Sequence, residues 1–163
     1  MPKVRTLSRT FLKAHPRAGE PTYFVEKFIL SRMCMGMPLS ELKQYDSLVS
    51  PDAIVELPKH HTIRMGRHFK ANDELTLAVW SGKPYHSKQV KLWTGPIMAI
   101  DIIITKTSFL KFYKEQVGKI TSLNLPIVAK NDGLSLADFE AWFNLPVGEH
   151  EAQILIWNKE IHY

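Results

Sequence analysis

The spacing of apolar residues changes several times along the chain, and three stretches follow the helical period. Residues 22–33 carry apolar side chains at helical spacing, and Thr22 is placed to cap that helix. A Gly-Met-Pro sequence at residues 36–38 ends it, and a second short helix is expected from Ser40. A third helix is expected over residues 136–143, behind a loose capping box.

Extended segments are predicted around these helices, because their apolar residues alternate or are β-branched. Residues 97–105 form the clearest strand, buried on both faces near residues 102–104. For residues 109–117 the pattern does not decide between strand and helix. Further strands are expected over residues 3–13, 62–64, 75–80, 90–107 with a break at 95–96, and 152–157, and turns over residues 72–74, 124–126 and 131–133.

The order of these elements predicts the fold class. A strand is followed by two helices, several strands, one more helix and a final strand, without alternating strand–helix–strand units. This order favours an α+β fold, a small mixed or antiparallel β-barrel flanked by helices. At 163 residues, the chain is expected to form a single domain over residues 1–163.

The composition is that of an ordinary globular protein, with 45% hydrophobic and 23% charged residues, which argues against disorder, collagen and coiled coil. The longest nearly apolar run, residues 96–104, is interrupted by Asp101 and is too short to span a bilayer. The N-terminus has no apolar segment of the kind that directs secretion. We therefore expect a cytoplasmic protein without a membrane partner.

Cysteine usage agrees with that location. Cys34 is the only cysteine, so the chain cannot form an internal disulfide, and a reducing compartment fits best. Because Cys34 lies beside Met33 and Met35, we expect it to be a small buried side chain rather than a nucleophile.

Charge is concentrated in the stretch from residue 57 to residue 91. The formal net charge is +5, which permits nucleic-acid or phosphate binding without requiring it. Two clusters lack acidic residues, and they can equally be solvated loops. Their basic residues are Lys59, Arg64, Arg67 and Lys70 in the first cluster, and Lys83, Lys88 and Lys91 in the second.

A hydroxyl, an ammonium and a guanidinium group come together in the first cluster. If Ile63 points to the core of a strand, Thr62 and Arg64 share the opposite, accessible face, and the preceding loop can fold Lys59 toward them. Arg64 can hold a phosphate or carbonyl group with two hydrogen bonds. A partly desolvated Lys59 near another cation can lose its proton and act as a base. The alternative is that Thr62 caps a turn and both basic side chains are solvated.

The seven histidines do not indicate a metal site. His60 and His61 are adjacent, so on a strand they point to opposite sides and cannot chelate one ion. No helical pair of histidines with a partnering acid is present, and a single cysteine excludes paired cysteine ligands. We expect no metal and no cofactor, and we interpret both histidines as spacers.

Aromatic residues accompany the second basic cluster. Trp80 ends an apolar strand, so burial in the core is the simpler interpretation for it. Tyr85 lies between Pro84 and His86 in a loop and is the better candidate to stack on a base.

Taken in order, these motifs resemble the ASCH domain family, which belongs to the wider PUA-like fold. The similarity covers roughly residues 22–157. It rests on three pieces, which are the Lys59-x-x-Thr62-x-Arg64 segment, the turn at residues 72–74 before a strand, and residues 131–139 with their Asn-Asp-Gly turn.

The resemblance implies a small PUA-like β-barrel flanked by helices and a role in binding RNA or nucleosides. One branch of the family looks like small amidohydrolases that remove the acetyl group from acetylated cytidine. There a Lys, a Thr three residues later and a distal Glu are the proposed catalytic residues. Lys59 and Thr62 fall on the first two positions, Asp132 stands where that branch has Glu, and Arg64 matches its arginine. Residues 31–56 look like a helical insertion relative to the smallest members.

Three hypotheses for function follow. In the first, a basic barrel cleft binds RNA or a modified nucleoside or nucleotide. In the second, Lys59, Thr62 and Asp132 remove an acyl group from a modified nucleoside such as acetylcytidine. The third is a ribonuclease in the same fold. The ligand-binding residues expected in the first hypothesis are Arg64, Arg67, Lys83, Tyr85 and Lys88. The sequence does not indicate an oligomeric state.

Overall fold

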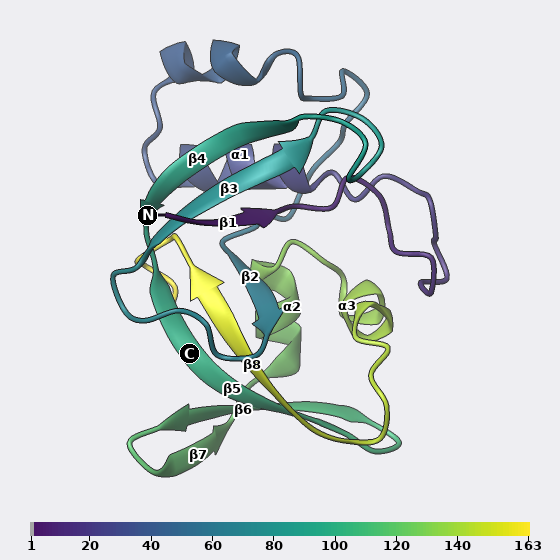
Figure 1. Ribbon diagram of the computed structural model, residues 1–163, viewed down its shortest axis with the longest axis vertical. Helices are drawn as coiled ribbons and strands as arrows, with labels where there is room; N and C mark the ends of the chain where they lie inside the picture. The colour runs from purple at the N-terminus through teal and green to yellow at the C-terminus, as the bar shows by residue number, and fades with distance from the viewer. Residues whose placement is uncertain (1) are drawn as a thin grey trace.

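The computed structural model describes residues 2–163 and shows a mixed α+β fold built on two sheets (Figure 1). The smaller sheet has three strands in the order β1-β3-β4, and the larger has five in the order β2-β8-β5-β6-β7. Strand β1 is parallel to β3, and every other pairing is antiparallel. In the described residues no ladder joins the two sheets, so they do not form a closed barrel. The strands are β1 (Lys3–Thr6), β2 (His61–Met65), β3 (Glu74–Trp80), β4 (Gln89–Pro96), β5 (Met98–Lys106), β6 (Leu110–Gln116), β7 (Lys119–Ser122) and β8 (Gly148–Ile156).

Helices flank the sheets. Helix α1 (Phe24–Cys34) packs against β4 and the end of β8, since the ring centroid of Phe28 lies 6.4 Å from that of Trp93 and 5.6 Å from that of Trp157. The 3-10 helix η1 (Leu39–Tyr45) follows it. Helix α2 (Leu125–Asn131) runs beside β2, and α3 (Leu136–Trp142) lies farther out (Figure 1).

The hydrophobic core lies between these layers. Alternation along β3 buries Leu75, Leu77 and Val79, as expected for a strand with one face inward. In β5 the alternation is also clear, because Ile102 and Ile104 are fully buried while Ile103 is only partly covered. The prediction that residues 102–104 are buried on both faces was therefore too strong.

Most predicted elements are present, and the differences have local causes. The N-terminal strand covers only Lys3–Thr6 of the expected residues 3–13, because residues beyond Leu7 leave the sheet to line a pocket. The pattern over residues 109–117 did not distinguish strand from helix, and the structure has strand β6 there. Strand β7 was not predicted. Tyr23, with φ 55°, and not Thr22 occupies the N-cap of α1, but the Thr22 hydroxyl still accepts from the Phe24 amide at 3.3 Å while donating to the Ser8 carbonyl.

Helix α2 was not predicted: the sequence pattern indicated a turn at residues 124–126, where the structure has the start of this helix. Asn124 caps the helix, because its side-chain oxygen accepts from the Ile127 amide at 3.3 Å. Pro126 lies in the first turn, where a backbone N–H would have no partner within the helix, so its missing N–H removes no helical hydrogen bond. Ser135 caps α3 as predicted, accepting from the Asp138 amide at 3.1 Å. Cys34 is exposed, contrary to expectation, because it lies at the C-terminal end of α1.

Among residues 2–163, no helix is both long and apolar enough to cross a membrane.

Candidate functional site

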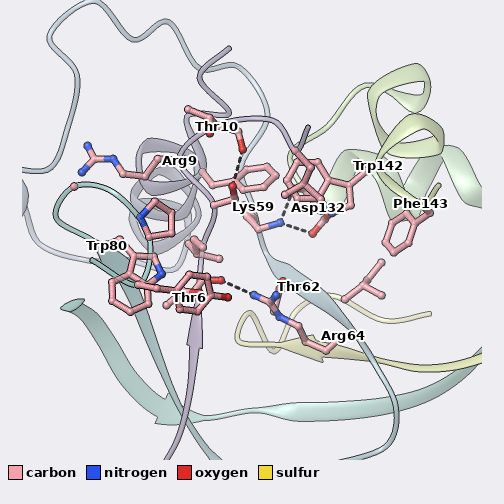
Figure 2. Close-up of a pocket in the computed structure, with 18 residues that line it drawn as sticks. Thr6, Arg9, Thr10, Lys59, Thr62, Arg64, Trp80, Asp132, Trp142 and Phe143 are labelled. Atoms are coloured by element: carbon pink, nitrogen blue, oxygen red, sulfur yellow. Dashed lines mark hydrogen bonds and ion pairs between the residues drawn. The ribbon is translucent and has the colours of Figure 1, made fainter. Parts of the chain in front are cut away.

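A pocket of about 500 Å³ opens between the N-terminal segment, β2, the loop after β3 and helix α3. Figure 2 shows Trp80 on one side of it and Trp142 and Phe143 on the other, with Lys59 and Asp132 between them. The lining therefore combines aromatic walls with a polar floor. The residues are Thr6, Leu7, Ser8, Arg9, Thr10, Leu12, Phe24, Lys59, Thr62, Ile63, Arg64, Trp80, Gly82, Pro84, Tyr85, Asp132, Trp142 and Phe143.

The backbone fixes the position of Lys59, two residues before β2. Lys59 and Asp132 form an isolated antiparallel bridge. The Lys59 amide donates to the Lys27 carbonyl at 2.9 Å, and the His60 amide donates to the Asn131 carbonyl at 2.7 Å. These bonds tie the segment before β2 to both α1 and the end of α2, so the Lys59 side chain leaves from a fixed point.

The Lys59 and Asp132 side chains form a buried ion pair. Lys59 Nζ donates to Asp132 Oδ1 at 2.5 Å and to the Asp132 carbonyl at 3.0 Å, as the dashed lines in Figure 2 mark. It also lies 4.1 Å from the centroid of the Phe24 ring, whose face attracts cations. Only 2% of Lys59 and 5% of Asp132 is exposed to solvent. Lysine is rarely buried to this extent unless it has partners of this kind.

Burial acts on both members of the pair in opposite directions. It lowers the pKa of Lys59, an effect that Asp132 partly offsets, and it raises the pKa of Asp132, an effect that Lys59 partly offsets. The two pKa values are therefore closer together than in water. A proton shared by the pair can move from Nζ to the carboxylate at a lower free-energy cost than between exposed groups.

Gly133 lets the turn after α2 approach Lys59 closely. Its φ is +76°, a backbone conformation that favours glycine. A Cβ atom there would lie 3.1 Å from Lys27 Cδ and 3.3 Å from Lys59 Cβ. Lys27 Nζ also donates to the Gly133 carbonyl at 2.6 Å. The Asn-Asp-Gly turn therefore places Asp132 against Lys59 because residue 133 has no side chain.

Thr62 and Arg64 line the same pocket, though less openly than expected. Thr62 is only 6% exposed. Within the described chain its hydroxyl makes no hydrogen bond to Lys59 or Asp132. Arg64 Nη2 donates to the Thr6 carbonyl at 2.7 Å, and its buried Nε has no partner. Burial, together with the nearby Arg5, lowers the pKa of Arg64.

Two aromatic side chains lie at the pocket mouth: Trp80 is the last residue of β3, and Tyr85 is in the loop that follows it. Tyr85 is 87% exposed and has a φ of 63°, and its ring centroid lies 5.3 Å from that of Trp80. Trp80 is half-buried and faces the pocket, so it is not the core residue that the sequence suggested. Both rings are positioned to contact a ligand at the pocket mouth.

The structure places the remaining predicted ligand-binding residues elsewhere. Arg67 is paired with Glu115 at 2.5 Å and with Glu151 at 3.2 Å, away from the pocket lining. Lys83 and Lys88 are exposed residues of the loop after β3 and do not line the pocket. The predicted set therefore divides into Lys59, Thr62, Arg64, Tyr85 and Asp132, which share one cavity, and three basic residues that do not.

The adjacent histidines are more than spacers. His60 Nδ1 lies 2.7 Å from Ser31 Oγ and 3.0 Å from Asn158 Nδ2. His61 is fully buried, with Nε2 3.2 Å from the Val128 carbonyl oxygen and Nδ1 3.5 Å from Asp132 Oδ1. The strand period could have indicated this, because Lys59 and His61 are two residues apart and share one face of an extended segment.

The aromatic wall at the end of α3 and the polar atoms of residues 6–10 also line the pocket, although the sequence did not indicate them as site residues. Trp142 and Phe143 were predicted only as a helix face, and residues 6–10 only as strand. No group of three or more histidine, cysteine, aspartate or glutamate residues in residues 2–163 is arranged to hold a metal ion.

A scan against protein-family models, a search of the curated proteins and a search of the solved structures each found no match to this chain.

Proposed function

We propose that the pocket binds a nucleoside-sized ligand and that the chain is a protein of the ASCH type with a PUA-like fold. The observation that carries the proposal is the composition of a single cavity: about 500 Å³ enclosed by aromatic rings, with Lys59, Thr62, Arg64 and Asp132 at its base. Cavities that hold small organic ligands have this size and this mixture of apolar walls and a few polar groups. Four motif residues of the family resemblance meet in it.

Each part of the lining has a role in this proposal. Tyr85 and Trp80 stack on the base, which supplies affinity with little dependence on base identity. Arg64, which lines the pocket, donates to a carbonyl or phosphate oxygen of the ligand. A free nucleoside or a flipped-out nucleotide suits this enclosed site better than an RNA duplex does.

Longer RNA remains compatible with the proposal through the loop after β3. Lys83 and Lys88 are exposed on the same loop as Tyr85, so they would contact phosphates on either side of a nucleotide in the pocket. Such contacts make binding weaker as salt rises. Arg67 is not part of this surface in the proposal, because two carboxylates already pair with it.

The PUA-like barrel is also part of the proposal. Strand β4 ends at Pro96 and β5 begins at Met98, so one residue connects the two sheets. A corner of this kind lets a sheet bend toward an open barrel.

Calorimetric titration with nucleosides and short oligoribonucleotides tests the binding proposal. A nucleoside is expected to bind, and Arg64→Met is expected to weaken binding about tenfold or more, since a hydrogen bond to a charged group contributes roughly 1.5–3 kcal/mol. Arg67→Met is the matched control and is expected to bind as wild type does. If no nucleoside or oligoribonucleotide binds at low salt, the proposal is wrong.

A second candidate, hydrolysis of an acyl group on a modified nucleoside, is favoured by one observation: Lys59 and Asp132, distant in sequence, are hydrogen-bonded at the base of the pocket. In this reaction the Lys59 amine takes a proton from Thr62 or from a water as the oxygen attacks the amide carbonyl carbon. The proton then passes to the leaving nitrogen as the carbon–nitrogen bond breaks. If Thr62 is the nucleophile, a water hydrolyses the acyl-threonine and releases the acid.

Turnover of acetylcytidine tests this candidate. Lys59→Met and Thr62→Val are expected to reduce kcat by at least a hundredfold, because general-base catalysis contributes roughly 10²–10⁴. Lys111→Met, which changes an exposed lysine of β6, is the control for loss of positive charge. Turnover that survives in Lys59→Met would exclude Lys59 as the base.

A further inference from the structure

We propose that His61 is a positioning residue: its Nδ1 accepts a hydrogen bond from a protonated Asp132 carboxyl group, and this arrangement holds Lys59 as a neutral amine. The role of that amine as a base rests on the hydrolytic function proposed above. The arrangement itself concerns only where protons lie in the resting protein, and it is therefore testable without a substrate.

The tautomer of His61 follows from its partners. Nε2 lies 3.2 Å from the Val128 carbonyl oxygen, which can only accept a hydrogen bond. Nε2 therefore carries the proton, and Nδ1 of the neutral ring has a free lone pair. The ring is fully buried and packs edge-on against Tyr163 at a centroid separation of 5.6 Å, so it has little freedom to turn.

Two acceptors would face each other if Asp132 were ionised. His61 Nδ1 is buried without a hydrogen-bond partner, and the nearest polar atom across from it is Asp132 Oδ1 at 3.5 Å. An unpartnered buried acceptor loses its hydration without compensation, and a carboxylate beside it makes this worse. A proton between Oδ1 and Nδ1 turns the repulsive contact into a hydrogen bond.

That proton is supplied by Lys59. Lys59 Nζ lies 2.5 Å from the same Oδ1 atom, so a proton can pass directly along this hydrogen bond. The N–H bonding pair becomes the lone pair of a neutral amine, the carboxylate becomes a carboxylic acid, and the total charge is unchanged. Rotation of the new O–H about its C–O bond then turns it from the amine toward His61 Nδ1, to which it donates, and the amine lone pair becomes free to accept a proton from a ligand or water.

The other charged groups around the pair act on both of its members. Burial has the largest effect on the pKa of Lys59 and lowers it, and the Arg64 cation from β2 lowers it further, whereas Asp132 opposes this. Burial raises the pKa of Asp132, although Lys59, Arg64 and Lys27 oppose this. Burial lowers the pKa of His61 well below its usual value, which keeps the ring neutral as the proposal requires.

The test is NMR titration of the lysine side chains, with Lys59 assigned by comparison with Lys59→Met. In the wild-type protein, Lys59 is expected to titrate below the ordinary lysine value of 10.5. His61→Phe keeps the ring packing but removes the acceptor, and it is expected to raise the Lys59 pKa by about one unit or more, which is tenfold in proton affinity. His60→Phe, at the adjacent histidine, is the control and should leave that pKa within a few tenths of a unit.

An unchanged Lys59 pKa in His61→Phe would overturn the proposal. If that variant does not fold, the nitrogen chemical shifts of His61 in the wild-type protein decide the matter. A neutral ring protonated at Nε2, with Nδ1 accepting a hydrogen bond, is expected, and a cationic ring or an Nδ1-protonated tautomer would overturn it. A shifted Lys59 pKa without any acetylcytidine turnover would refute the hydrolytic function and leave the proton arrangement standing.

Discussion

Lys59 and Asp132 lie 73 residues apart in the chain and are joined at three points: a backbone bridge, and two hydrogen bonds from one ammonium group to the carboxylate and the carbonyl of the same residue. The side chains therefore meet through backbone geometry rather than through flexible surface pairing. Both line the pocket of about 500 Å³ that Trp80, Trp142 and Phe143 also line.

Breaking this pair is expected to destabilise the protein strongly. Lys59→Met leaves the buried Asp132 carboxyl group without its partner, which costs about 3–5 kcal/mol of unfolding free energy if that group is ionised and about 1–3 kcal/mol if it is protonated. The double variant Lys59→Met/Asp132→Leu leaves no buried charge and is expected to recover most of that loss. Urea denaturation of both variants measures the difference.

The exposed pair between Lys3 and Asp73, joined at 2.7 Å, is the control. Lys3→Met is expected to cause a much smaller change, because exposed pairs are screened by water and salt. If Lys59→Met is no more destabilising than Lys3→Met, the buried pair does not contribute as the geometry indicates.

Local patterns were sufficient to predict part of this site and not the rest. The segment from Lys59 to Arg64 was recognised because its polar groups are close in sequence, and the Asn-Asp-Gly turn because its residue types favour turns. His61 was missed because its role depends on Val128 and Asp132, which no local pattern connects with it. Arg67 was wrongly included because charge alone does not reveal that Glu115 and Glu151 neutralise it.

The fold, like the site, was predicted from the sequence only where a local pattern marks an element. Runs of apolar and β-branched residues identified β3 and β5, whereas α2 was missed because Asn124 and Pro126 favour turns and helix starts equally. Strand β7 is exposed along its whole length, so no apolar period marks it. The pairing of two separate sheets is a long-range property, and the order of elements alone did not predict it.

Protein stability is expected to fall as the pH drops below about 6.5. Burial lowers the pKa of both His60 and His61 in the folded state, so below the unfolded value of 6.5 the unfolded chain binds more protons than the folded one. Each histidine then reduces the unfolding free energy by up to about 1.4 kcal/mol per pH unit. Urea midpoints at several pH values between 5 and 8 measure the slope.

The contribution of His61 is isolated by comparing slopes. Asp132 acts with the opposite sign, because its raised pKa makes the folded state bind more protons in acid. The difference between wild type and His61→Phe cancels the contribution of His60, which both proteins share, and retains that of His61 together with its effect on Asp132. A variant with the same pH dependence as wild type would show that His61 does not remain neutral in the folded protein.

Gly133→Ala is expected to lower the unfolding free energy by more than the strain of a positive φ alone, because the added Cβ also meets close neighbours. A non-glycine residue at φ +76° costs roughly 1–3 kcal/mol. The added Cβ would also lie 3.1 Å from Lys27 Cδ and 3.3 Å from Lys59 Cβ. Gly118→Ala is the matched control, because its φ is +72° and its Cβ would meet nothing within 4 Å. Equal losses of unfolding free energy for the two variants would contradict the close approach at Gly133.

Tyr85 provides the clearest separation of binding from stability. Because its side chain is 87% exposed, Tyr85→Ala is expected to leave the unfolding free energy nearly unchanged. It is expected to weaken nucleoside binding by roughly 1–3 kcal/mol, the range measured for loss of one base–aromatic stack. Tyr85→Phe keeps the ring and should retain most of the affinity, as measured by calorimetric titration. If Tyr85→Ala binds as tightly as wild type, the ligand does not stack at the pocket mouth, and Trp80 or Trp142 must supply the aromatic contact.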